Sequence, residues 1–172
     1  IKPSEKNRLD AEKKIKNIRE RIFSGESFSG LAEIYSADPG SKNNGGSLGY
    51  IRRNQMVKDF ETIAFTQKIK MLSEPVETSF GFHILETTEK SGEKIKVRHI
   101  LISPAITEED ETNTYNYAMT LRDSSKSLYS FKKLVTKHSD DEPTKKIGGD
   151  LGWITPNNSP IPAIADVLGL LE

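Results

Sequence analysis

Apolar residues near the start of the chain recur with the spacing of an α-helix. Behind Ser4, which can cap a helix, one stripe of apolar residues three or four positions apart ends before Gly25: Ala11, Ile15, Ile18 and Ile22. A shorter stripe with the same spacing follows: Phe28, Leu31, Ala32 and Tyr35. The pattern predicts two consecutive amphipathic helices.

Short strands are predicted beyond these helices. A strand over Leu48–Ile51 follows a Gly-Gly turn, and a helix with Phe60, Ile63 and Ala64 directed inward comes next. Pro75-Val76 and Phe82–Glu86 are expected to form later strands, with Gly81 marking a bend. In Val97–Ile102 strict alternation places Val97, His99 and Leu101 on one face of a further strand.

Part of this pattern occurs twice. The segment from Ser36 to Ile51 is matched 103 residues later by the segment from Ser139 to Ile154, including its Gly-Gly-x-Leu-Gly-aromatic turn. At the same offset Phe28 and Leu31 match Phe131 and Leu134. Because solenoid repeats run roughly 20 to 50 residues, so long a period indicates tandem domains.

The repeat predicts two modules, residues 1–90 and 97–172, joined by a polar linker over residues 91–96 that contains Ser91-Gly92. Ile1–Pro3 matches Ile102–Pro104, at the end of the strand that opens the second module. We therefore expect the first module to lack most of its first strand. The second module is expected to lack its last two strands, since Glu172 falls within its late helix.

Composition narrows the function classes. The chain has 25 Lys and Arg against 25 Asp and Glu, so nothing draws it to nucleic acid or an anionic membrane. No apolar run approaches the roughly 18 residues of a membrane span, so no membrane insertion is expected, and any signal peptide would lie upstream. There is no cysteine, and the three histidines lack ligand spacing. We expect neither a metal nor another cofactor.

Four motifs in order resemble the parvulin (rotamase) family of peptidyl-prolyl cis/trans isomerases: Ser36-Ala37-Asp38, the turn Gly45–Tyr50, Met56 with Phe60, and Thr78–His83. The resemblance implies an α+β, parvulin-like fold in which short helices surround a small antiparallel sheet, here in two tandem copies, each truncated at a chain end. Tandem modules of this kind resemble SurA-type chaperones. That likeness implies a periplasmic or otherwise extracytoplasmic protein that acts on unfolded, proline-containing outer-membrane or exported polypeptides.

The resemblance also implies the site residues. In the first module Asp38, His83 and Thr78 would form the catalytic polar network, and Leu48, Met56 and Phe60 the proline pocket, all converging on one concave site. In the second module His99 and Asp141 match catalytic positions and Leu151 a pocket position. Simpler roles remain open: satisfied strand histidines for His83 and His99, core packing for Met56 and Phe60, and turn or capping roles for Asp38 and Asp141.

Function therefore stays open between a peptidyl-prolyl isomerase with chaperone activity and a non-catalytic peptide-binding chaperone module. A secreted structural or adhesion domain is a third class, which nothing in the chain favours. Neither module by itself holds both strand histidines. One hypothesis resolves this: a hairpin over residues 82–102 would add Val97–Ile102 to the first sheet, in cis or exchanged within a dimer, and bring His99 to Asp38 and His83. The alternative pairs Val97–Ile102 only with Leu151–Ile154.

Overall fold

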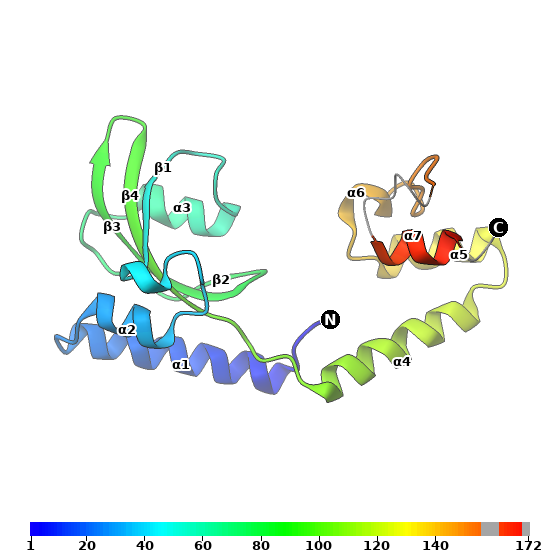
Figure 1. The fold of residues 1–172 in the computed structure, drawn as a ribbon, viewed down its shortest axis with the longest axis horizontal. Coiled ribbons are helices and arrows are strands. Elements are labelled where there is room, and N and C mark those ends of the chain that lie inside the picture. The colour runs from blue at the N-terminus through cyan, green and yellow to red at the C-terminus, as the bar shows by residue number, and fades with distance from the viewer. Residues whose placement is uncertain (156–161, 170–172) are drawn as a thin grey trace. The chain divides into compact units, whose positions relative to one another are not determined.

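A computed structural model describes residues 1–155 and 162–169 (Figure 1). The chain divides into two compact units, Ile1–Thr112 and Asn113–Glu172. Its elements in order are α1 (Glu5–Phe23), α2 (Phe28–Tyr35), η1 (Lys42–Asn44), β1 (Ser47–Ile51), α3 (Lys58–Thr66), β2 (Val76–Thr78), β3 (Gly81–Ser91), β4 (Lys94–Ile102), α4 (Glu108–Ser124), α5 (Leu128–His138), α6 (Glu142–Lys145) and α7 (Pro162–Gly169).

The first two helices follow the sequence pattern closely. The Ser4 hydroxyl accepts a hydrogen bond from the backbone N–H of Asn7, and Ser27 caps α2 in the same way. The buried positions of α1 are the predicted stripe residues Ala11, Ile15 and Ile18. Capping and the apolar stripe together therefore set where α1 begins and which face it buries.

The first unit contains a four-stranded antiparallel sheet with the order β1-β4-β3-β2. Its centre is a hairpin of β3 and β4 within one chain, in which Ile84 pairs with Ile100 and Leu85 with His99. β1 pairs with the edge of β4 that faces away from β3, and there Ile51 pairs with Ile95. The hairpin predicted as one hypothesis from the sequence is therefore present, and β4 fills the central place in this sheet.

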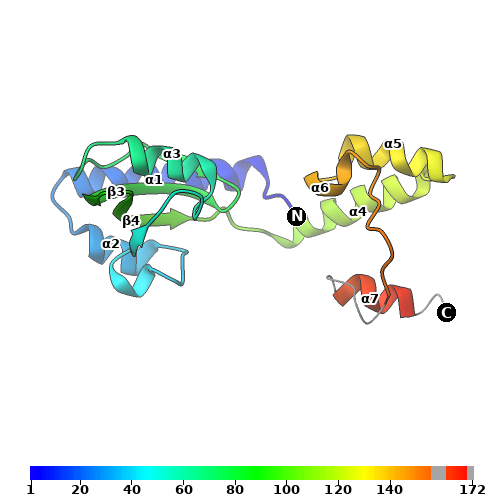
Figure 2. The ribbon, with the colours of Figure 1, turned by 90° about the horizontal axis from the view of Figure 1, so that it is seen from above.

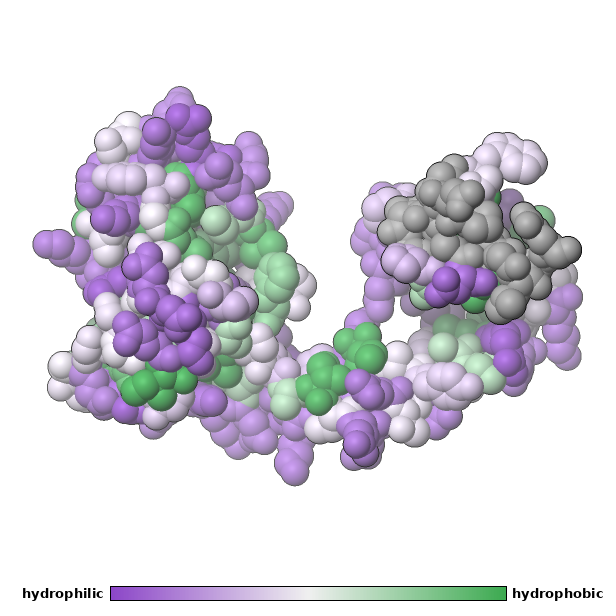
Figure 3. Space-filling model, in the orientation of Figure 1, coloured by the Kyte–Doolittle hydropathy of each residue, from purple (hydrophilic) through white to green (hydrophobic). Residues whose placement is uncertain are grey.

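Both faces of the sheet are covered by helices (Figure 1). On one face α1 and α2 pack against Phe82 and Ile84 of β3 and Ile100 and Ile102 of β4. On the other face α3 packs against Leu85, Ile95 and Val97. Since side chains alternate along a strand, each strand of the hairpin contributes to both core clusters. Hydrophilic residues dominate the visible outer surface of this unit (Figure 3).

The domain boundary in the structure lies later in the chain than the sequence predicts. Residues 91–96 are not a linker: β3 ends at Ser91, Gly92 adopts a positive φ of 58° in the turn, and β4 begins at Lys94. The polar residues of this stretch are the exposed side of a projecting two-stranded ribbon, while Ile95 is buried. Residues 97–112, expected in the second module, thus belong to the first unit.

The second unit has no strand among its described residues, 113–155 and 162–169. The part of α4 from Asn113 onward belongs to this unit and lies beside α5 (Figure 2), and α6 follows α5. Residues 156–161 and 170–172 of the expected second module lie outside the described residues. Within the part of the chain that is described, none of the helices has the length and apolar character of a bilayer-crossing segment.

The glycine turn before β1 gives a first testable prediction. A Cβ on Gly46, whose φ is 80°, would lie 2.2 Å from the carbonyl oxygen of His99, whereas one on Gly49, whose φ is 67°, would meet open space. Gly49→Ala should therefore cost only the left-handed backbone strain, about 1 kcal/mol, and Gly46→Ala about 3 kcal/mol, because a clash with the backbone of β4 is added. Urea unfolding of both variants measures the difference. Equal losses of unfolding free energy in Gly46→Ala and Gly49→Ala would show that β4 does not lie against this turn.

Candidate functional site

Two histidines meet on the face of the sheet that α3 covers. Across the β3–β4 hairpin His83 pairs with Leu101 and His99 with Leu85, so the two histidines are diagonal neighbours. Both are buried, 4% and 5% exposed. Their Nδ1 atoms lie 3.3 Å apart, and the ring planes are inclined by only 15°. The hairpin therefore unites histidines that the sequence assigns to different repeats.

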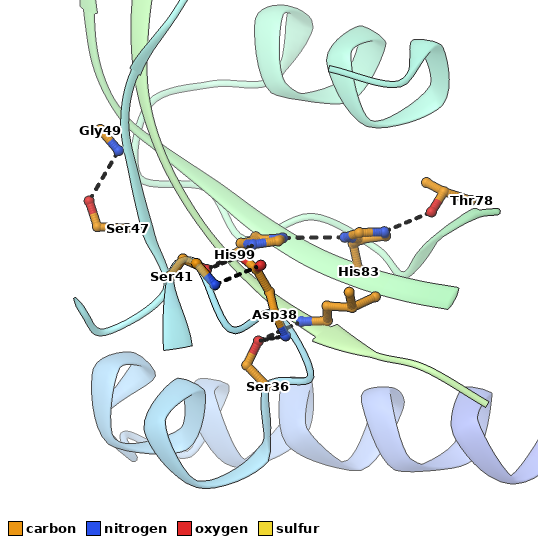
Figure 4. A network of polar contacts seen from close by, with 10 residues as sticks. Ser36, Asp38, Ser41, Ser47, Gly49, Thr78, His83 and His99 are labelled. Atoms are coloured by element: carbon orange, nitrogen blue, oxygen red, sulfur yellow. Dashed lines mark hydrogen bonds and ion pairs between the residues drawn. The ribbon is translucent and has the colours of Figure 1, made fainter. Parts of the chain in front are cut away.

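A chain of polar contacts extends from both rings (Figure 4). On one side the hydroxyl of Thr78 lies 2.8 Å from Nε2 of His83. On the other side Nε2 of His99 lies 2.8 Å from Oδ2 of Asp38 and 3.0 Å from Oγ of Ser41. The result is a continuous series of contacts from Thr78 through His83 and His99 to Asp38.

The proton positions follow from the ionised end of this series. A carboxylate only accepts hydrogen bonds, so Nε2–H of His99 must donate to Asp38. In a neutral ring Nδ1 of His99 is then an acceptor, and Nδ1–H of His83 donates to it. That leaves Nε2 of His83 to accept from the Thr78 hydroxyl. Every hydrogen bond of the series is thus donated in the direction from Thr78 to Asp38, and both imidazoles are neutral.

Burial supports these protonation states. It lowers the pKa of His83 from 6.5 to about 4, and the neighbouring His99 adds to the effect. Burial also lowers the pKa of His99, although hydrogen bonding to Asp38 opposes the shift. Burial raises the pKa of Asp38, but hydrogen bonds from Ser41, His99 and the Gly40 backbone outweigh it, so this pKa falls below 3.8. Near neutral pH the site therefore holds one carboxylate and two neutral rings.

An apolar wall borders the histidines. The Phe60 ring of α3 meets both imidazoles edge to face, with centroids 5.4 Å from His83 and 5.5 Å from His99. Phe60 is itself buried, at 2% exposure, in the second core cluster, against which the half-buried Leu48 and Met56 pack. The predicted apolar residues Leu48, Met56 and Phe60 therefore share one cluster, which touches the histidine pair through Phe60.

The loop after α2 holds Asp38 in place. Its Oδ1 accepts from the backbone N–H of Gly40 at 3.1 Å, and its Oδ2 accepts from the hydroxyl of Ser41. The loop is tied to β4 because the backbone N–H of Ala37 donates to the carbonyl of Leu101 at 2.7 Å. Ser41, fully buried, contacts both Asp38 and His99, and the sequence reasoning missed it. The sequence does contain a signal for Ser41: it ends an Asp-Pro-Gly-Ser turn, and in such turns the Asp and Ser side chains often form hydrogen bonds within the loop.

Of the three site residues expected in the second module, two, Asp141 and Leu151, lie in the second unit. Asp141 is the residue before α6, and its carboxylate accepts a hydrogen bond from the Thr144 hydroxyl but none from a backbone N–H of the helix. Leu151 is 44% exposed and belongs to no strand. Both residues are in the second unit, whereas His99 is in the first, where its carboxylate partner is Asp38 and not Asp141. In residues 1–155 and 162–169 no three His, Asp or Glu side chains gather as a metal site would require.

The lowered histidine pKa values predict how stability depends on pH. In the unfolded chain His83 binds a proton near pH 6.5, but in the folded unit only near pH 4. As the pH falls from 6.5 towards 4, the unfolded state therefore gains protons first, and the free energy of unfolding decreases. Urea unfolding at pH 7.5 and pH 5 should show this loss, and His83→Gln should reduce it. An equal pH dependence in both proteins would contradict a buried, neutral His83.

Comparisons with known proteins agree with this architecture. The family model of the rotamase, or PPIC-type peptidyl-prolyl isomerase, domain matches residues 1–89 and 99–170. The chain is 49% identical over 79 residues to foldase protein PrsA 4 of Bacillus cereus, covering 46% of the chain and 28% of that protein. It is 45% identical over 83 residues to foldase protein PrsA of Geobacillus kaustophilus, covering 48% and 30%.

A third relative covers more of the chain. Chaperone SurA of Chromohalobacter salexigens is 35% identical over 116 residues, which are 63% of the chain and 27% of that protein. The chain thus spans less than a third of the length of each of these relatives. Because the family model matches nearly the whole chain in two successive segments, the chain belongs to the parvulin-type, or PPIC-type, peptidyl-prolyl cis/trans isomerase domain family.

Proposed function

We propose that the first unit catalyses cis/trans isomerisation of Xaa-Pro peptide bonds in unfolded polypeptides. One observation carries the proposal: the ordered contacts from Thr78 through His83 and His99 to Asp38 lie directly against the apolar cluster of Phe60. The unit thus combines a buried polar network with an adjoining apolar cluster, whose half-buried members Leu48 and Met56 would meet a proline ring first. Both parts come from residues 1–112, so the second unit is not needed to complete the site.

Catalysis of Xaa-Pro isomerisation requires only a modest lowering of the barrier to rotation about the amide bond. Amide resonance opposes rotation with a barrier of about 18–20 kcal/mol, and the uncatalysed change takes tens to hundreds of seconds. Reaching milliseconds requires about five decades in rate, or about 7 kcal/mol. No covalent intermediate is needed, because a site that binds the twisted amide more tightly than either planar form lowers this barrier.

Each side chain has a part in this scheme. Phe60, Met56 and Leu48 would hold the pyrrolidine ring away from water, and such surroundings disfavour the charge-separated planar form of the amide. The neutral rings of His83 and His99 would border the turning carbonyl without the strong hydration of a charged group. Thr78 and Asp38 are positioning residues, which fix the tautomer and orientation of the two imidazoles.

The proposal extends to the clients and the compartment. The similar proteins are named foldase PrsA and chaperone SurA, which supports a role in assisting folding. We take the clients to be extended, proline-containing polypeptides, such as exported or outer-membrane proteins, and the compartment to be periplasmic or otherwise extracytoplasmic. The absence of cysteine is compatible with an oxidising compartment.

An exchange-NMR isomerisation assay with short Xaa-Pro peptides tests the proposal. The chain should accelerate exchange between the cis and trans signals, and His83→Ala should abolish most of the acceleration. Lys58→Ala, an exposed substitution at the start of the helix that carries Phe60, should leave it unchanged. Peptide binding without any acceleration would instead identify a non-catalytic peptide-binding module.

A further inference from the structure

An ion pair joins the first helix to the edge strand that carries Thr78. Nε and Nη2 of Arg8 in α1 donate to the two carboxylate oxygens of Glu77 in β2, both at 2.7 Å. The hydrogen bond from Arg8 lowers the pKa of Glu77, so the pair is ionised near neutral pH. Two parallel N–H···O bonds give such a contact a defined geometry. The contact therefore fixes where Glu77 lies relative to α1.

Alternation along β2 places Glu77 and Thr78 on opposite faces of the sheet. Glu77 pairs with Phe82 of β3, and Phe82 belongs to the core cluster on the α1 face. The Arg8 guanidinium also lies over the Phe82 ring, 5.4 Å from its centroid. Thr78 points to the other face, where its hydroxyl lies 2.8 Å from Nε2 of His83 (Figure 4). The ion pair thus holds β2 from the side opposite the histidine site.

Other contacts hold β2 less fully. The strand has three residues and forms an edge of the four-stranded sheet, where it pairs with β3. Val76 packs against the core cluster on the α3 face. α1 also holds the chain before the strand, because Arg19 donates to the backbone carbonyl of Ser73 at 2.8 Å. The Arg8–Glu77 pair extends this hold to the end of the strand.

The position of β2 decides whether the Thr78 hydroxyl reaches His83. Oγ1 of Thr78 accepts the backbone N–H of Phe80 at 3.1 Å, which leaves the hydroxyl proton for Nε2 of His83. This bond keeps the proton of the His83 ring on Nδ1, where it is donated to His99. A displacement of β2 by about 1 Å would lengthen the contact from 2.8 Å beyond hydrogen-bonding range.

We propose that Arg8 and Glu77 are positioning residues of the isomerase site, whose ion pair holds β2 so that the Thr78 hydroxyl stays bonded to His83. Their role in isomerisation rests on the proposed function. The two side chains are 33% and 48% exposed, and exposed ion pairs contribute little to stability. The expected effect is on the site, since a misplacement of about 1 Å can reduce a catalysed rate about 100-fold.

A second ion pair of the first unit provides a matched control. Arg21 and Glu26 form the same two-bond contact, at 2.8 and 2.7 Å, and their side chains are also 33% and 48% exposed. The Arg21 guanidinium likewise lies over an aromatic ring, that of Tyr35. This pair joins the end of α1 to the turn before α2 and so does not involve β2. Any effect of losing an exposed ion pair as such should therefore be equal in both.

Glu77→Ala should slow isomerisation about tenfold in the exchange-NMR assay, because Thr78 is no longer held. Glu26→Ala should keep the rate within about twofold of the unaltered chain. In Glu77→Ala the ¹⁵N shift of Nε2 of His83 should move, since this nitrogen loses its hydrogen-bond donor, while Nε2 of His99 should keep its shift. Equal rates in the two variants, an unchanged His83 signal, or a shifted His83 signal with an unchanged rate would each overturn the proposal.

Arg8→Met tests the other half of the pair, and it keeps an apolar stem over Phe82. It should reproduce both effects of Glu77→Ala. The double variant should be no slower than either single variant, as expected for residues that act together. Losses of rate that multiply in the double variant would show that the two residues act separately and would contradict the proposal. Circular dichroism and urea unfolding verify that each variant is folded in the assay.

The His83 signal separates this proposal from the proposed function. If the unaltered chain does not accelerate isomerisation, the proposed function fails, and the ¹⁵N shift of His83 in Glu77→Ala still shows whether the ion pair positions Thr78. If the unaltered chain is active but Glu77→Ala changes neither the rate nor the His83 signal, the positioning proposal fails alone.

Discussion

Replacing Phe60 with alanine should reduce isomerisation on the order of 100-fold and destabilise the first unit by about 3–5 kcal/mol. Phe60 is 2% exposed and touches both imidazole rings, so its loss leaves a cavity where the core meets the polar network. The histidines would lose the surface that fixes their planes, and the proline ring would lose its flat apolar partner. Exchange NMR gives the rate, and urea unfolding gives the stability.

One control variant separates the effect on isomerisation from the effect on stability. Ile63→Ala truncates a neighbouring apolar residue of the same helix that is partly buried in the same cluster but makes no ring contact with the histidines. It should lower stability and leave most of the isomerisation rate at temperatures where the unit stays folded. A Phe60→Ala protein that is folded at the assay temperature and keeps full activity would remove Phe60 from the proposed proline site.

Removing the Asp38 carboxylate should be the second large effect. Asp38→Ala deprives the buried Nε2–H of His99 of its charged acceptor at 2.8 Å and leaves only Ser41, so the unit should lose about 1–3 kcal/mol. Isomerisation should fall on the order of 100-fold, because a misplaced imidazole pair no longer borders the twisted amide correctly. ¹⁵N shifts of the histidine rings report which nitrogen carries each proton.

Asp38→Asn distinguishes orientation from charge. Its amide oxygen can still accept from His99, so the tautomers of both rings should persist, and activity should exceed that of Asp38→Ala. If Asp38→Asn instead behaves like Asp38→Ala while its ¹⁵N shifts match those of the unaltered protein, the negative charge itself is required. A fully active Asp38→Ala protein would show that the carboxylate only holds the turn.

Much of the first unit was predictable from local pattern. The period of three to four residues identified α1 and α2, Ser4 marked the start of α1, and alternation placed His99 on the same face as Val97. These features depend on neighbours in sequence. Resemblance to a family motif identifies Asp38, His83 and Thr78 as site residues, and the structure brings them into one network with His99. Their catalytic roles remain predictions.

What the sequence left open depends on contacts between distant residues. Val97–Ile102 has the same alternation whether it pairs with β3 or with residues 151–154, so pattern could not choose. The linker expected over residues 91–96 failed for a related reason, because a polar stretch around Ser91-Gly92 suits a hairpin turn as well as a flexible connection. Ser41 was overlooked since its two partners, Asp38 and His99, converge only in three dimensions.

NMR on a mixture of isotope-labelled and unlabelled chains tests most directly whether β4 completes the site of the first unit. The account predicts cross-peaks linking Leu85 with His99 and His83 with Leu101, all of them within single chains. The same spectra should connect the rings of His83 and His99, whose nearest nitrogens are 3.3 Å apart. Cross-peaks from residues 97–102 to residues 151–154 instead, or cross-peaks only between labelled and unlabelled chains, would contradict it.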